Sequence, residues 1–157
     1  MKEKVDAIIE ALKQRYADAP CALHYEKDYE LMIAVRLSAQ CTDARVNITC
    51  VELFEKFPTV ESMADGDILD IEAIVRPCGL YHTKAQNIKD ACRILVEEYN
   101  GIVPDDMDAL LALPGVGRKI ANLLLGDIYK KGGVVTDTHC IRICGRLGFY
   151  PETVKEP

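Results

Sequence analysis

A lysine and an aspartate eighteen positions apart are the residues of this chain best suited to covalent chemistry. Lys119 ends the string Leu-Pro-Gly-Val-Gly-Arg-Lys, and Asp137 stands in the string Val-Thr-Asp-Thr-His. A neutral lysine amine is a strong nucleophile toward an electrophilic carbon, and a neighbouring carboxylate can assist proton transfer or stabilise developing positive charge. The pair therefore predicts an amine and a carboxylate that act together on one carbon atom, such as a deoxyribose carbon.

The glycines that precede Lys119 predict a site for a phosphate. Glycine adopts backbone angles closed to other residues, and its lack of a side chain lets a ligand approach the main chain. The string also opens a helix, whose first N–H groups lack internal acceptors and attract anions. A lone Gly-x-Gly fits an ordinary turn between helices equally well, but the complete string favours DNA binding. The candidate DNA-binding residues of this turn are Leu113, Gly115, Val116, Gly117 and Arg118.

Simpler roles exist for both members of the pair. Most lysines in the first turn of a helix are solvated, and aspartate caps a helix well without any catalytic role. The helix macrodipole disfavours a cation at a helix N-terminus, however, and so favours the neutral amine of Lys119. Capping and catalysis by Asp137 are compatible, because a capping carboxylate is held in a fixed direction.

The charge distribution permits a nucleic-acid partner although the whole chain is acidic. The 157 residues carry a net charge of -6, which by itself argues against phosphate binding. Residues 110–150 contain six basic and two acidic residues, a charge of +4, which leaves -10 elsewhere. The basic segment is the one that contains the glycine string.

The composition predicts a soluble globular protein with one substantial core. No apolar run approaches the roughly 20 residues that span a bilayer, and the first residues lack the apolar core of a signal peptide, so we expect a cytoplasmic, nucleoid-associated protein without a membrane partner. The seven cysteines are scattered through apolar helical patterns and are odd in number, which favours reduced thiols over disulfides.

Helical periodicity runs through the whole chain, and no convincing pair of strands appears. We therefore predict an all-α fold, a multi-helix bundle. Asp43 and Thr83 are expected N-caps, and Gly132 is expected to stop the helix that begins at Arg118. The expected helices cover residues 3–16, 29–37, 43–57, 59–64, 67–75, 83–100, a short segment after 104–106, 118–129 and 138–147.

Two polar connectors, at residues 38–43 and 79–84, lie where helices stop. Leu80 stands there between a glycine and an expected cap, so we expect an exposed apolar side chain able to wedge into a base stack. A metal site at His139, Cys140 and Cys144 is not favoured, because a second pair of ligands is missing and structural zinc usually takes four.

Taken together, these motifs closely resemble those of bacterial endonuclease III enzymes, in the helix-hairpin-helix (HhH-GPD) superfamily of DNA glycosylases. The resemblance runs from about residue 5 to residue 150. It includes the strings at 30–35, 37–43, 79–87, 103–104, 113–122 and 137–146, in the order and spacing of the family. Ile120 departs from the threonine common in this motif, a minor change.

The resemblance implies an enzyme of base-excision DNA repair. The family removes oxidised pyrimidines from duplex DNA and cleaves abasic sites. Lys119 would be the nucleophile that forms a Schiff base and leads to β-elimination, and Asp137 the assisting carboxylate. Gln40 would fill the gap left by the flipped nucleotide, Leu80 would be the intercalating wedge, and His82 would also contact DNA. A lysine at position 119 favours the glycosylase/lyase branch over the adenine glycosylases.

The resemblance also implies a domain organisation of the six-helix barrel type. Residues 20–132 would form the helical barrel with the hairpin at 107–129, and residues 1–19 plus 133–157 would belong to a second domain. Family members continue through a four-cysteine [4Fe-4S] module, which we expect to be absent here, because its ligands would have to lie beyond Pro157. Association through the apolar faces left exposed is a further expectation. The apolar residues concerned are Leu12, Tyr16, Ile141 and Ile143.

Two alternatives to a working glycosylase/lyase stay open at this point. A truncated helix-hairpin-helix module without activity would bind duplex DNA in a salt-dependent way and leave the strand intact. A purely structural helical protein would bind no DNA even at low salt.

Overall fold

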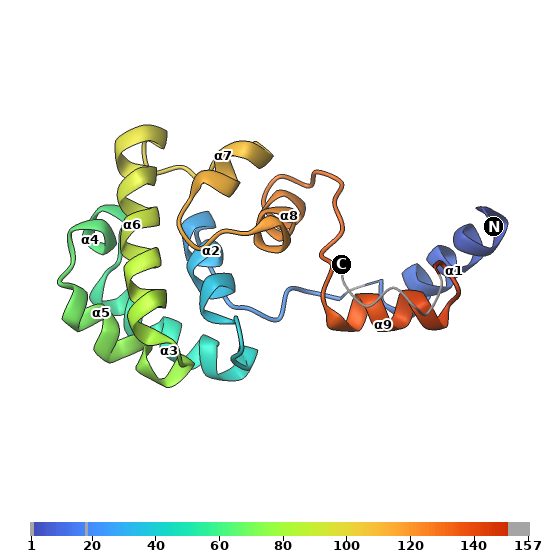
Figure 1. The fold of residues 1–157 in the computed structure, drawn as a ribbon, viewed down its shortest axis with the longest axis horizontal. Coiled ribbons are helices and arrows are strands. Elements are labelled where there is room, and N and C mark those ends of the chain that lie inside the picture. Colours follow the sequence, from blue (N-terminus) through green and yellow to red (C-terminus); the bar gives the residue numbers. More distant parts are fainter. Residues whose placement is uncertain (1, 18, 151–157) are drawn as a thin grey trace.

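The computed structural model describes residues 2–17 and 19–150, and its regular elements are helical throughout (Figure 1). No strand occurs in this part of the chain, so the all-α prediction is confirmed. No helix among these residues is long and apolar enough to cross a membrane. In chain order the elements are α1 (Lys2–Arg15), α2 (Asp28–Leu37), α3 (Asp43–Lys56), α4 (Val60–Asp65), α5 (Ile68–Val75), the 3-10 turn η1 (Arg76–Cys78), α6 (Tyr81–Tyr99), α7 (Met107–Ala112), α8 (Arg118–Asp127) and α9 (Thr138–Arg146).

Helix α2 lies at the centre of the molecule. Leu31, Ile33 and Leu37 are completely buried, and only Asp28 and Arg36 among its residues are not classed as buried. It packs against α3, α6 and α8. A helix with apolar residues on nearly all sides is stable only inside a core, and the helix predicted at residues 29–37 is confirmed.

Helix α6 is the long support on which α4 and α5 pack. Its buried positions Ala85, Ile88, Cys92 and Leu95 recur at helical spacing and form the face that meets the core. The chain turns away after Tyr99, because Asn100 takes a left-handed conformation with φ 52° and the Gly101 N–H donates to the Leu95 carbonyl at 2.8 Å.

Three expected helix ends are wrong. Thr42, not Asp43, is the N-cap of α3. Thr83 does not cap α6, which begins at Tyr81, because η1 ends at Cys78 and Leu80 then turns the chain into the helix with φ 49°.

Helix α8 also ends earlier than expected. Its last residue is Asp127, and the chain leaves the helix through Lys130, which adopts φ 54°. The Lys131 N–H then donates to the Leu125 carbonyl at 2.9 Å. A lysine in the left-handed conformation therefore closes this helix two residues before Gly132.

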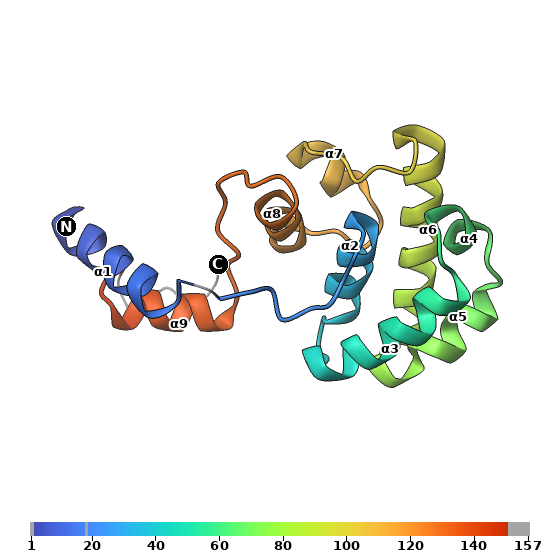
Figure 2. The same ribbon diagram turned by 180° about the vertical axis from the view of Figure 1, so that it is seen from behind.

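Helices α1 and α9, far apart in sequence, lie side by side at one end of the molecule (Figures 1 and 2). Lys4 Nζ donates to the Leu147 carbonyl at 2.6 Å. Neither helix contains a buried residue. Leu12, Tyr16 and Ile143 are exposed, with 49%, 62% and 48% of their surface accessible, as expected from the sequence. This pair of helices is therefore held by far less apolar packing than the body formed by α2 to α8.

Candidate active site

Helices α7 and α8 pack together and form the predicted helix-hairpin-helix. Asp106 begins the hairpin as the N-cap of α7, where its carboxylate accepts the N–H groups of Asp108 and Ala109, each at 3.0 Å. The side chains of Leu113 and Val116 are buried in the core. These two residues anchor the turn, and their buried side chains are not available to a ligand.

Gly115 is the position where the turn requires glycine. Its φ of 78° lies in the left-handed region, which disfavours a side chain. A Cβ atom there would also lie 2.5 Å from Arg36 Nε and 2.8 Å from Asn87 Nδ2. The turn thus rests directly on side chains of α2 and α6. The Asn87 amide, with its oxygen toward Arg36, accepts from Arg36 Nε at 3.3 Å and Nη2 at 2.9 Å.

Gly117 differs from the expectation that both glycines use special backbone angles. Its φ is -95°, which any residue adopts, and a Cβ atom there would meet nothing within 4 Å. Because Gly117 has no side chain, the main chain at the start of α8 is left open to solvent. Neither Gly115 nor Gly117 donates its N–H to a main-chain acceptor within residues 2–17 and 19–150, and α8 has no side-chain cap. These N–H groups are available for an anion.

Lys119 lies in the first turn of α8, exposed to solvent, and Asp137 is the N-cap of α9. The Asp137 carboxylate accepts the Cys140 N–H at 2.7 Å. This hydrogen bond is the main cause that lowers the pKa of Asp137, and the Lys119 ammonium lowers it further, against the opposing effect of burial. Lys119 and Asp137 therefore lie close enough to interact electrostatically, yet they form no ion pair within 4.0 Å in the described chain.

Gln40 and Leu80 share an unusual backbone conformation. Both have positive φ, 58° and 49°, and both are exposed; Leu80 keeps 61% of its surface accessible. The expected exposure of Leu80 is confirmed. His82, two residues later, donates through Nδ1 to the Glu72 carboxylate at 2.8 Å, and the centroid of its ring lies 4.1 Å from that of Tyr81.

One buried residue next to these loops escaped the sequence analysis. Lys84 is completely buried, and its Nζ donates to the carbonyl oxygens of Leu37, Ala39 and Cys78 at 2.9, 2.8 and 2.7 Å. The sequence analysis placed Lys84 only at the end of the polar connector at residues 79–84. A signal was present, however, because Lys84 precedes Ile88 by four residues and so falls on the buried face of α6.

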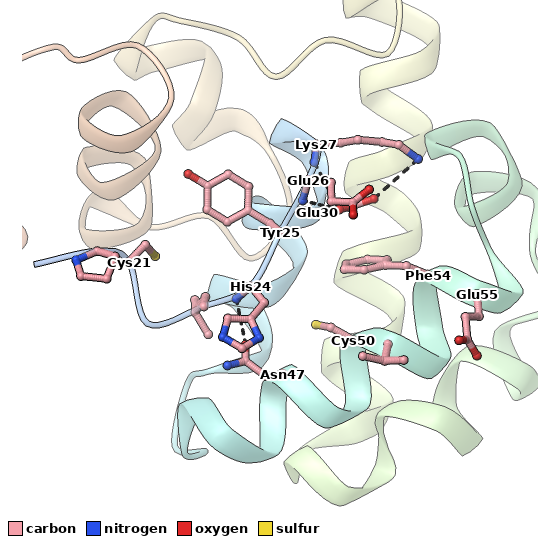
Figure 3. A pocket seen from close by; sticks show the side chains of 13 residues that line it. Cys21, His24, Tyr25, Glu26, Lys27, Glu30, Asn47, Cys50, Phe54 and Glu55 are labelled. Carbon is pink, nitrogen blue, oxygen red and sulfur yellow. Dashed lines mark hydrogen bonds and ion pairs between the residues drawn. The ribbon is translucent and has the colours of Figure 1, made fainter. Parts of the chain in front are cut away.

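A surface hollow of about 780 Å³ lies where the segment before α2 crosses α3 (Figure 3). Its wall includes Glu30, whose carboxylate accepts the main-chain N–H groups of Glu26 and Lys27 at 2.8 and 3.2 Å. Neither Lys119 nor Asp137 lines it. The polar groups of this hollow are used to hold the entry to α2, so it is separate from the candidate site.

The cysteines do not fit a [4Fe-4S] cluster. Cys50, Cys78 and Cys92 are buried separately in the core, and burial raises the pKa of the Cys50 and Cys92 thiols to about 12. Cys140 and Cys144 lie one helical turn apart, with their Sγ atoms 3.9 Å from each other. Across the described ranges, no three His, Cys, Asp or Glu side chains are grouped to hold a metal.

Comparisons with known proteins agree with this geometry. A model described as "HhH-GPD superfamily base excision DNA repair protein" matches residues 33–157. Endonuclease III of Synechocystis sp. is 42% identical over 153 residues, which cover 97% of this chain and 70% of the relative. Two solved structures, a non-covalent endonuclease III–DNA complex and a trapped endonuclease III–DNA covalent intermediate, are each 40% identical with a TM-score of 0.91, and each match covers 98% of this chain and 72% of the other.

An all-helical body with a glycine hairpin, an exposed lysine and a nearby capping aspartate defines a helix-hairpin-helix protein of base-excision repair. Within that class, the chain belongs to the endonuclease III family of DNA glycosylases and lyases.

The two glycines of the hairpin should respond differently to substitution. We expect Gly115→Ala to reduce the free energy of unfolding by roughly 1–3 kcal/mol, because the new Cβ combines positive φ with contact to Arg36 and Asn87. Gly117→Ala should stay within about 0.5 kcal/mol of wild type, because its Cβ enters open space. Urea unfolding of the three proteins measures both values, and equal losses would contradict this difference between the glycines.

The cap of α9 should titrate below the ordinary range of a carboxyl group. The pKa of Asp137 is lowered from 3.8, so its contribution to stability is complete above that pH and is lost as the pH falls through the lowered folded value. An NMR titration of the Asp137 carboxyl carbon, with the Cys140 amide as a second reporter, should give one midpoint below 3.8. A midpoint at or above that value would show that the carboxylate does not hold the Cys140 N–H.

Proposed function

We propose that this chain excises oxidised pyrimidines from duplex DNA and cleaves the strand at the resulting abasic site. The observation that carries the proposal is the position of Lys119, which is exposed beside the open main chain of the hairpin and within electrostatic reach of Asp137. An amine beside an anion site can attack a sugar carbon while the neighbouring phosphate is bound. The relative trapped as a covalent intermediate with DNA supports the same class of reaction.

In the proposed reaction, the Lys119 amine attacks C1′ of a flipped nucleotide. The bond between Nζ and C1′ forms as the glycosidic bond breaks, and the base leaves with the bonding electrons and gains a proton. Opening of the sugar ring then gives a protonated Schiff base. Loss of a C2′ proton expels the 3′ phosphate by β-elimination, and water releases Lys119 from the cleaved strand.

Asp137 assists this reaction as a carboxylate rather than as a carboxylic acid. Its hydrogen bond from Cys140 keeps it ionised and fixes its direction. A fixed negative charge stabilises positive charge that develops on the sugar, and the carboxylate can accept a proton from the Lys119 ammonium to free the neutral amine for attack. Lys119 and Asp137 form no ion pair with each other in the described ranges, and the sugar would then lie between them.

DNA would be held by groups on both sides of this space. The N–H groups of Gly115 and Gly117 and the first turn of α8 suit a phosphate. Arg118 adds an exposed positive charge at the same point. On the other side, Leu80 would enter the base stack, Gln40 would fill the gap of the flipped nucleotide, and His82 would contact the backbone or bases nearby.

We further propose two functional units within the chain. Residues 20–132 would form the barrel that carries Lys119, and residues 1–19 with 133–157 would form the unit that carries Asp137. Damaged duplex DNA would be the partner, which places the protein on chromosomal DNA in the cytoplasm.

Replacement of the nucleophile tests the proposal. With duplex DNA containing an abasic site and sodium borohydride, the wild-type chain should form a covalent adduct, because the reagent reduces a Schiff base. Lys119→Gln should form none, and Asp137→Asn should form it at least roughly 100-fold more slowly. Gel separation of adduct and free protein measures both.

Lys130→Gln is the matched control, since Lys130 lies just beyond the opposite end of α8 and its ammonium, among the residues that the structure describes, donates only to the Asp127 carbonyl. It should trap as well as wild type. Adduct from Lys119→Gln would reject the proposed nucleophile. Salt-dependent DNA binding by the wild type without any adduct or cleavage would instead indicate a binding module without lyase activity.

A further inference from the structure

The buried ammonium of Lys84 joins two loops that are distant in sequence. Its three hydrogen bonds reach Leu37 and Ala39, at the end of α2, and Cys78, in η1. An ammonium group has three donors, and these three carbonyl oxygens use all of them. No carboxylate among the described residues pairs with this ammonium, so its charge holds main-chain oxygens.

The carbonyl groups that Lys84 holds lie next to the two exposed residues with positive φ. Ala39 directly precedes Gln40, and Cys78 is followed by Gly79 and Leu80. The main-chain N–H of Lys84 also donates to the Leu80 carbonyl, at 3.0 Å. Hydrogen bonds to the single residue Lys84 therefore hold the main chain on the N-terminal side of Gln40 and around Leu80.

A buried cation at this position has a cost. Desolvation lowers the pKa of Lys84, and the nearby Arg36 guanidinium adds to the effect, while the Cys78 and Cys41 thiols oppose it. An apolar side chain of similar length would avoid that cost, but it would leave three carbonyl oxygens without a donor. Lysine at this position therefore fixes the geometry of the two loops, which an apolar side chain of similar length would not do.

We propose that Lys84 is a positioning residue that makes the loops of Gln40 and Leu80 one rigid unit for opening the DNA stack. The inference rests on the proposed function, in which these two residues enter duplex DNA. Lys84 itself touches neither the DNA nor the reacting atoms. Its loss should affect substrates in which a stack has to be opened and spare those in which it does not.

Lys89 provides a matched control on the same helix. It is five residues further along α6, and its Nζ donates to the Ala64 carbonyl at 2.9 Å and to the Gly66 carbonyl. It therefore joins the end of α4 and the turn that follows it to α6, in the way that Lys84 joins the two loops, at a place away from Gln40 and Leu80. Lys84→Met and Lys89→Met each remove one lysine that holds buried or half-buried carbonyl groups.

The test compares cleavage of an abasic site in duplex DNA with cleavage of the same site in a single-stranded oligonucleotide, which has no stack to open. The full chain is used in every case, under saturating DNA. For Lys84→Met we expect the ratio of duplex to single-strand rates to fall about 10-fold or more, and for Lys89→Met we expect the wild-type ratio. Lys84→Arg, which keeps the charge, should lie between wild type and Lys84→Met.

Equal ratios for Lys84→Met and Lys89→Met would overturn the inference, because both would then act only through stability. If Lys84→Met does not fold, Gln40→Ala, Leu80→Ala and the double variant replace it in a double-mutant cycle. Non-additive effects on the duplex rate support one rigid unit, and additive effects overturn it. A wild-type chain inactive on both substrates would overturn the proposed function itself, an outcome distinct from these.

Discussion

The buried ammonium of Lys84 is the interaction that holds the loops of Gln40 and Leu80, the candidate DNA-contacting loops, in place. Its three carbonyl acceptors tie the end of α2 and the turn η1 to the first turn of α6. The hairpin is placed by a different contact, because a Cβ atom on Gly115 would collide with the side chains of Arg36 and Asn87. The two loops and the hairpin are thus all held in place by contacts with α2 and α6, the most deeply buried part of the fold.

The candidate catalytic pair is divided between differently packed parts of the structure. Lys119 stands on α8, which packs against α2, whereas Asp137 caps α9, which contains no buried residue (Figure 2). Asp137 is aimed locally, through its hydrogen bond from Cys140. The distance between this amine and carboxylate depends on the segment that joins α8 to α9, so the geometry of the candidate pair is less strongly fixed than the geometry of the loops that Lys84 holds.

Local patterns in the sequence were sufficient for most of the fold and for the hairpin. Helical periodicity predicted the buried α2, and the glycine string predicted the turn before Lys119. Position-specific backbone geometry was less predictable: Gly117 has an ordinary φ, and Leu80 and Lys130 adopt left-handed angles that their residue types disfavour. Lys84 was missed because its acceptors Leu37 and Ala39 lie 47 and 45 residues away, and only the folded chain brings these carbonyl oxygens around one ammonium.

The central claim is that the nucleophile is Lys119 and no other amine. Peptide mapping by mass spectrometry, after borohydride reduction on abasic-site DNA and digestion of both components, identifies the modified residue directly. The account predicts that the reduced sugar remnant is found on Lys119 alone. A remnant on another lysine, such as Lys84 or Lys130, or on the N-terminal amine would contradict it.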